Sequence, residues 1–288
     1  MASVKDIVVA LEGGLGNQMF QYAAGRALAL RTGAPLTLDL RTLLRHGERA
    51  YGLGDFQLGG GPGLLTAGSP ERAGNLRRLF RRLTGGEQVF REAGYAYDER
   101  IRFASAPVRL EGYFQSERYF ADATTTLRTD LMPRPELLAT VDGLAGRLLP
   151  SGPSLSLHVR RGDYAKPATM AVHGLLTPEY YERALHAVTE RVGKVTVCVF
   201  SDEPDWVRAN LRLPAETRFV SEHTRTALQD LLLMSRCTHH IIANSTFSWW
   251  GAWLNPRPDK VVVTPERWFQ PAAGLDTRDL RPAGWLEA

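Results

Sequence analysis

Short runs of apolar residues alternate with longer amphipathic stretches along most of the chain. The first apolar run, 7–11, precedes a glycine-rich loop and then apolar positions at helical spacing, which end near Gly33. Pro35 then leads into a second short segment, 36–39, so this region predicts a strand, a helix and a second strand. Such a unit brings its strands together in parallel, because the helix returns the chain to the same end of the sheet. We therefore expect an α/β fold.

The second half of the chain shows the same alternation more regularly. Thr226-x-x-Gln229 is a capping box that predicts the start of a helix. Residues 52–70 are rich in glycine and proline and predict a loop. Prolines between 133 and 153 suggest a boundary between two domains, residues 1–150 and 151–288. The strands expected in the second domain are residues 154–159, 195–200, 240–243 and 261–264.

Composition narrows the class of protein. Of the 288 residues, 44% are hydrophobic and 23% are charged, which is typical of a globular domain and excludes a disordered, collagen-like or coiled-coil chain. The net charge of +4 is too small to indicate a nucleic-acid partner. The apolar run 7–11 is too short for a signal peptide, and two cysteines make no disulfide framework. We expect an intracellular protein.

One stretch leaves a question of membrane contact open. Residues 74–84 place leucine and phenylalanine on one side of a predicted helix and four arginines on the other. A solvated helix face is the favoured interpretation. Peripheral contact with an anionic membrane is the alternative, because such helices lie on lipid surfaces.

The clearest candidate for chemistry is the sequence His158-Val159-Arg160-Arg161-Gly162-Asp163, where a predicted strand gives way to a loop. Ligands of open α/β sheets bind at the carboxyl ends of the strands. A guanidinium group can bind a diphosphate and neutralise a phosphate leaving group, and Asp163 can hold one arginine in place. A surface ion pair is the alternative.

Other polar residues follow predicted strands or begin predicted helices. The stretch 244–248, Asn-Ser-Thr-Phe-Ser, lies between a strand and a helix, where unpaired N–H groups suit a phosphate and plain N-capping is the alternative. Asp202 ends a strand, and Asp230 lies in the first turn of a helix. Each of these two carboxylates, taken alone, suggests a structural role. No Asp-x-Asp sequence occurs, so no metal site is predicted.

The glycine loop supports a different enzyme class. Gly14-x-Gly16-x-x-Met19, with Asp39 at the end of the next strand, resembles a dinucleotide-binding fingerprint and suggests an NAD-dependent oxidoreductase. Met19 stands where the third glycine is expected, which weakens this interpretation. A sugar-nucleotide-binding module without catalysis is a third, less favoured hypothesis.

Four longer motifs resemble the alpha-1,2-fucosyltransferases of glycosyltransferase family 11. They occur in order, and the similarity runs from residue 7 to about residue 269. They are GGLGNQMFQYA (13–23), GYFQSERYF (112–120), HVRRGDY (158–164) and ANSTFSWWGAWL (243–254).

The resemblance implies a GT-B fold, with two Rossmann-like domains facing a central cleft. The C-terminal domain would bind GDP-L-fucose, and the N-terminal domain would form the acceptor side. The enzyme would transfer fucose to the 2-hydroxyl of a galactose-containing glycan with inversion. It would need no metal and no cofactor besides the donor substrate.

The resemblance also implies roles for individual residues. Arg160 would grip the β-phosphate and, with Asp163, serve catalysis, while Asp230 would contact the guanine and Asp202 the ribose or base. No residue is a compelling base; Glu12, Asp39 and His158 are weak candidates, and a loose transition state would reduce the need for one. The acceptor-side residues would be Asn17 and Gln18. The donor-binding residues would be His158, Arg160, Arg161, Asp202, Asp230, Asn244, Ser245, Thr246, Ser248, Gly14, Gly16 and Asn17.

Overall fold

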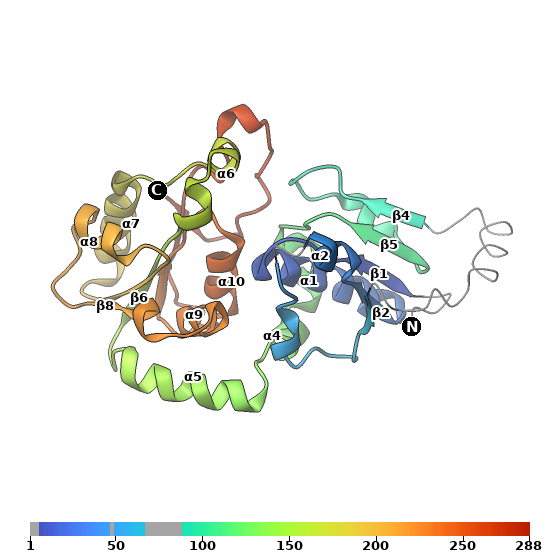
Figure 1. Cartoon of the computed structure of the whole chain (residues 1–288), viewed down its shortest axis with the longest axis horizontal. Helices are drawn as coiled ribbons and strands as arrows, with labels where there is room; N and C mark the ends of the chain where they lie inside the picture. Colours follow the sequence, from blue (N-terminus) through green and yellow to red (C-terminus); the bar gives the residue numbers. More distant parts are fainter. Residues whose placement is uncertain (1–5, 47–48, 67–87) are drawn as a thin grey trace, which may run out of the picture. The chain divides into compact units, whose positions relative to one another are not determined.

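A computed structural model of the chain describes residues 6–46, 49–66 and 88–288. They form two compact units, one ending at Arg134 and taking in Asp276–Leu280, the other formed by the remaining residues from Pro135 (Figure 1). The sequence placed this boundary after residue 150, but helix α5 (Pro135–Leu148) belongs to the second unit. There Arg236 pairs with Asp142 of α5 at 2.5 Å. The arginine-rich stretch 74–84 lies outside the described residues.

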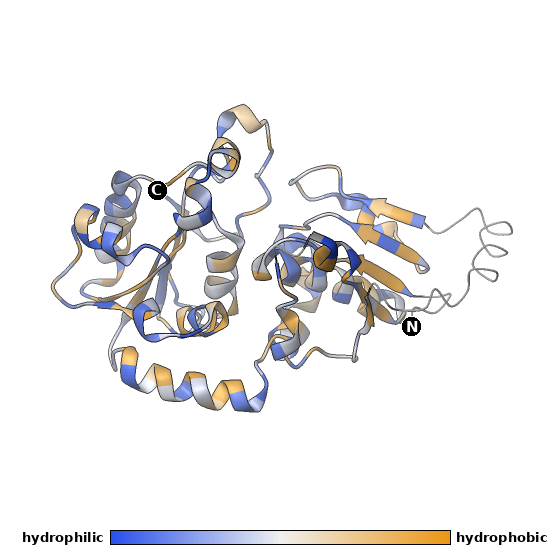
Figure 2. Cartoon of the chain, viewed as in Figure 1, coloured by the Kyte–Doolittle hydropathy of each residue, from blue (hydrophilic) through white to orange (hydrophobic). Residues whose placement is uncertain are grey.

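The first unit is built on a parallel sheet with the order β3-β2-β1-β5-β4. The apolar strand β1 is orange along its length in Figure 2. Helix α1 packs closely on it, since a Cβ at Gly25 would lie 2.3 Å from Cγ2 of Val9. The elements are β1 (Ile7–Ala10), α1 (Leu15–Thr32), β2 (Leu36–Asp39), α2 (Arg41–His46), β3 (Gly63–Leu65), β4 (Gln88–Arg91), β5 (Val108–Glu111) and α4 (Thr124–Asp130).

The second unit has a six-stranded parallel sheet with the order β11-β10-β9-β6-β7-β8. Its core joins apolar residues of β6, β7, β9 and β10 to the buried side of α7, including Tyr181, Ala184 and Val188. The elements are β6 (Ser154–Val159), α6 (Pro167–His173), α7 (Pro178–Val192), β7 (Thr196–Ser201), α8 (Pro204–Asn210), β8 (Thr217–Phe219), α9 (Ala227–Met234), β9 (His239–Ile241), α10 (Thr246–Leu254), β10 (Val262–Thr264) and β11 (Leu286–Glu287).

Both sheets confirm the predicted α/β class. In each sheet the strand order reverses once beside the first strand of the unit, between β1 and β5 and between β6 and β9. Loops that follow the two strands at such a reversal diverge to opposite faces of the sheet and leave room for a ligand. The glycine loop follows β1, and the Arg160 loop follows β6.

Two further expectations can be compared with the fold. The predicted loop 52–70 contains strand β3, which pairs in parallel with β2. Cys198 and Cys237 are both buried and free. No helix within the described ranges is both long and apolar enough to span a bilayer.

Candidate donor site at the strand reversal of the second unit

Arg160 lies just after β6 and is held by two carboxylates. Its Nη2 is 2.5 Å from Oδ1 of Asp163, and its Nη1 is 2.8 Å from Oδ2 of Asp202. The side chain is 28% exposed, so these two contacts do not bury it. A guanidinium that is already oriented in this way loses little conformational entropy when it binds an anion. The free-energy cost of binding is therefore lower.

The backbone at Gly162 lies close to the side chain of Asp202. A Cβ at Gly162 would lie 2.5 Å from Oδ2 of Asp202, the oxygen that faces the arginine. Asp202 follows the neighbouring strand β7, and its Oδ1 accepts a hydrogen bond from the backbone N–H of Arg161. Asp202 therefore contacts both arginines of the motif.

The side chain of Arg161 has partners of its own. Its Nε donates to Oε2 of Glu203 at 3.0 Å, and its guanidinium lies 3.9 Å from the ring centroid of Trp206. Both partners lie on the segment after β7. Arg161 thus ties the loop after β6 to the segment that follows the neighbouring strand β7. Sequence reasoning overlooked Glu203 and Trp206.

Asp230 lies in the first turn of α9 and accepts two hydrogen bonds. Ser221 Oγ and Thr224 Oγ1 each donate to it at 2.7 Å. Burial raises the pKa of Asp230, and the two hydroxyl donors oppose that shift. Ser221 Oγ also accepts a hydrogen bond from the N–H of Ser201 at the end of β7. Asp230 is therefore linked through Ser221 to the end of β7, which Asp202 follows. The hydroxyl groups of Ser221 and Thr224 were not identified from the sequence.

The loop after β9 brings Asn244 and the start of α10 to the same edge of the sheet. Asn244 Nδ2 donates to the carbonyl oxygens of His173 and Trp268, and Tyr164 Oη donates to the Asn244 carbonyl at 3.2 Å. Tyr164 belongs to the Arg160 loop, so the two predicted phosphate-binding loops are directly joined. Ser245 is the N-cap residue of α10, Thr246 is its first residue, and Ser248 Oγ donates to the Ser245 carbonyl.

Three buried polar atoms at this edge lack a hydrogen-bond partner among the residues that the structure describes. They are Nδ1 of His158, Nδ1 of His173 and Oδ1 of Asn244. Burial and the nearby Arg160 charge lower the pKa of His158 to about 3, so its imidazole is neutral at neutral pH. Buried polar atoms usually have a partner. These atoms are therefore consistent with a ligand site. A histidine with so low a pKa is a poor base.

The glycine loop of the first unit is fixed by amide side chains. Gly14 is the N-cap residue of α1, and Gly16 is buried in its first turn. Gln18 is buried, and its amide bonds to the carbonyls of Gly13 and Ala50 and to the N–H of Gly52. Asn17 is half-buried, and its Oδ1 accepts a hydrogen bond from Gln115 Nε2 at 3.1 Å. Of the two predicted acceptor-side residues, Asn17 is the more accessible.

The two acids of this unit that the sequence offered as weak candidate bases, Asp39 and Glu12, have different surroundings. Burial opposes the charge on Asp39, but hydrogen bonds from Arg41 and Arg109 outweigh it and lower its pKa to about 2. Asp39 is therefore neither a base nor free for a ribose, which removes the support for a dinucleotide site. Burial, assisted by Glu111, raises the pKa of Glu12.

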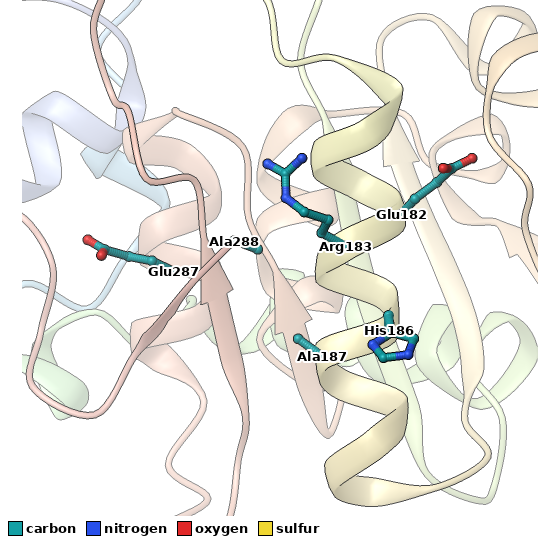
Figure 3. A pocket seen from close by; sticks show the side chains of 6 residues that line it. All are labelled: Glu182, Arg183, His186, Ala187, Glu287 and Ala288. Carbon is teal, nitrogen blue, oxygen red and sulfur yellow. The ribbon is translucent and has the colours of Figure 1, made fainter.

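A hollow elsewhere in the second unit is separate from this site. It has a volume of about 520 Å³ and lies between α7 and the last residues of the chain (Figure 3). His186 pairs there with Glu190, and Glu287 pairs with Arg281. None of the predicted donor residues lines this hollow. Its lining residues are Glu182, Arg183, His186, Ala187, Glu287 and Ala288.

Comparison with known families decides the class of enzyme. The model of glycosyl transferase family 11 matches residues 90–279. The chain belongs to this family. It is therefore a glycosyltransferase, and the oxidoreductase hypothesis is set aside.

Relatives of known type extend the similarity beyond the matched region. An alpha-1,2-colitosyltransferase from Escherichia coli is 31% identical over 97% of this chain and 98% of its own. The O-antigen biosynthesis glycosyltransferase WbnK, also from Escherichia coli, is 32% identical over 96% and 98%. A crystal structure of the alpha-1,6-fucosyltransferase NodZ, soaked with GDP-fucose, superposes with a TM-score of 0.51 at 16% identity, covering 88% of this chain and 94% of NodZ. That likeness confirms the predicted GT-B fold class.

Proposed function

We propose that this glycosyltransferase moves L-fucose from GDP-L-fucose to the 2-hydroxyl of a galactoside, with inversion and without a metal. The observation that carries the proposal is the cluster of Arg160, Asp163 and Asp202 at the strand reversal of the second unit. A diphosphate that leaves the sugar gains negative charge in the transition state. A guanidinium that is already oriented stabilises this charge, as preorganised donors do in other transfer reactions.

The other predicted donor residues fit around such a diphosphate. The N-terminus of α10, at Ser245 and Thr246, presents backbone N–H groups that suit phosphate oxygens. The carboxylate of Asp230 suits the N–H groups of a guanine edge, which are hydrogen-bond donors. His158 and Asn244 supply two of the three unpartnered buried atoms described above. Asn17 would serve the acceptor, together with the loop that carries Gln115.

A second nucleotide sugar is also a candidate donor substrate. Colitose is the 3-deoxy form of L-fucose, and a relative that aligns with nearly the whole chain is named for its transfer in an alpha-1,2 linkage. GDP-colitose is therefore the second candidate donor. Its transfer would keep the same diphosphate site and the same acceptor hydroxyl, and would change only the contacts to the 3-position of the sugar.

Incubation of the protein with GDP-fucose and lactose, followed by mass analysis, tests this function. We expect a fucosylated product, formed equally well in excess EDTA because Arg160 and the α10 N-terminus offset the diphosphate charge. A parallel reaction with GDP-colitose ranks the two donors, and magnetic resonance of the product identifies the linkage. Activity that EDTA abolishes and magnesium or manganese restores would contradict the mechanism. If neither GDP-fucose nor GDP-colitose yields a glycosylated product, the proposed reaction is contradicted.

A further inference from the structure

Glu92 is an acid whose carboxylate binds only hydrogen-bond donors without charge among the described residues. It follows directly after β4 and is half-buried. Its Oε2 accepts hydrogen bonds from the backbone N–H groups of Tyr113 and Phe114, at 2.8 and 2.9 Å. Its Oε1 accepts one from Tyr119 Oη at 2.8 Å. Burial raises the pKa of Glu92, and these three hydrogen bonds oppose that shift.

The two backbone groups belong to a segment with an unusual conformation. Phe114 has φ +54°, a left-handed value that a bulky side chain rarely adopts. Such a residue persists only where its surroundings determine its conformation. Its ring is fully buried and lies edge-on to Tyr119, with ring centroids 5.2 Å apart. The carboxylate of Glu92 thus accepts hydrogen bonds from the successive N–H groups of Tyr113 and Phe114, where the backbone has its left-handed conformation.

The same segment, 112–116, is tied to the rest of the first unit on either side of Phe114. Gln21 Nε2 donates to the Gly112 carbonyl at 3.1 Å, and Ser116 Oγ donates to the Asp279 carbonyl at 2.6 Å. Between them, Gln115 Nε2 donates to Asn17 Oδ1. Among these contacts, only those of Glu92 hold the N–H groups of the left-handed turn, and that turn determines where Gln115 meets Asn17.

We propose that Glu92 is a positioning residue for the acceptor: it fixes segment 112–116 so that Gln115 holds Asn17 in its working orientation. The proposal rests on the proposed function, in which Asn17 lies on the acceptor side. Glu92 acts through the segment and need not touch a sugar. It lies outside the four motifs that identify the family, so its role follows from the hydrogen bonds and not from the sequence similarity.

The test compares Glu92→Ala, Glu92→Gln and the surface control Glu99→Gln, with GDP-fucose and lactose as substrates. Loss of a hydrogen-bonded charged group corresponds to about a ten- to hundredfold effect. We expect Glu92→Ala to raise the KM for lactose by that factor, while the affinity for GDP and the slow hydrolysis of GDP-fucose by water stay within twofold. Glu92→Gln should be milder, because its amide oxygen can still accept from Tyr113 and Phe114. Glu99→Gln, which changes an exposed acid, should match the wild type.

Hydrogen exchange at the Tyr113 and Phe114 amides supplies a readout that does not depend on turnover. Both amides should exchange faster in Glu92→Ala, with the melting temperature showing whether the rest of the chain stays folded. If Glu92→Ala does not fold, the lactose KM of Glu92→Gln decides the question. A wild-type lactose KM, or an equal loss of GDP affinity, would overturn the positioning role. A wild-type enzyme that transfers no fucose would instead overturn the proposed function, and the exchange of these amides would still test the control of the segment by Glu92.

Discussion

Replacement of Arg160 by alanine is expected to lower the rate of fucosyl transfer by about a hundred- to a thousandfold, the usual loss for one preorganised donor to a developing anion. The reason is that Arg160 is the arginine held, partly exposed, at the end of β6 by Asp163 and Asp202. Replacement by lysine should restore only part of the rate. A compact ammonium cannot engage both carboxylates and a phosphate with the planar fork of a guanidinium.

The measurement is kcat with GDP-fucose at saturating acceptor, with the affinity for GDP determined separately by calorimetry. Arg191→Ala, an exposed arginine on α7 of the same unit, is the matched control and should behave as the wild type. Melting temperatures show whether loss of the ion pairs has disturbed the loop. An Arg160→Lys variant with the wild-type rate would show that the geometry of the fork is unimportant.

Replacement of Asp230 by asparagine is expected to weaken GDP binding by about ten- to a hundredfold, as for other hydrogen bonds to a charged group. Its carboxylate is already oriented by Ser221 and Thr224, and it has further lone pairs for the N–H groups of guanine. Asparagine keeps the shape of the side chain but loses the charge and one acceptor oxygen.

Comparison of GDP with inosine diphosphate, which lacks the exocyclic amine, makes this test specific. The wild type should prefer GDP, and Asp230→Asn should lose most of that preference. Ser221→Ala, which removes one of the two hydroxyl donors to Asp230, should show a smaller loss. An Asp230→Asn variant that keeps the full preference for GDP would remove Asp230 from guanine recognition.

Local patterns in the sequence were enough to predict the central strands. Strands β2 and β6 have the predicted bounds, Gly33 ends α1 with φ +68°, and Thr226 accepts the capping hydrogen bond from Gln229. Strand β3 could not be predicted from its glycine-rich sequence, because its extended form depends on pairing with β2. Strand β5 is short, and its polar residues Arg109 and Glu111 pair with each other.

In the candidate site, too, local contacts could be predicted from the sequence, and contacts between distant segments could not. The contact between Arg160 and Asp163 spans three positions and follows from one motif. The contact with Asp202 spans 42 positions and needs the parallel pairing of β6 with β7. Glu92 gives no signal in the sequence, because its partners become neighbours only when β4 pairs with β5. Motifs therefore indicated the candidate loops, while the residues that support these loops followed only from the sheet topology.

The central claim is that GDP binds the second unit at the reversal between β6 and β9. Hydrogen exchange with and without GDP tests it most directly. We expect GDP to protect residues 155–165 and 226–250 more strongly than residues 36–40, because the first group carries Arg160, Asp230 and the start of α10. Protection confined to residues 10–40, with none around Arg160, would contradict the assignment of the donor site.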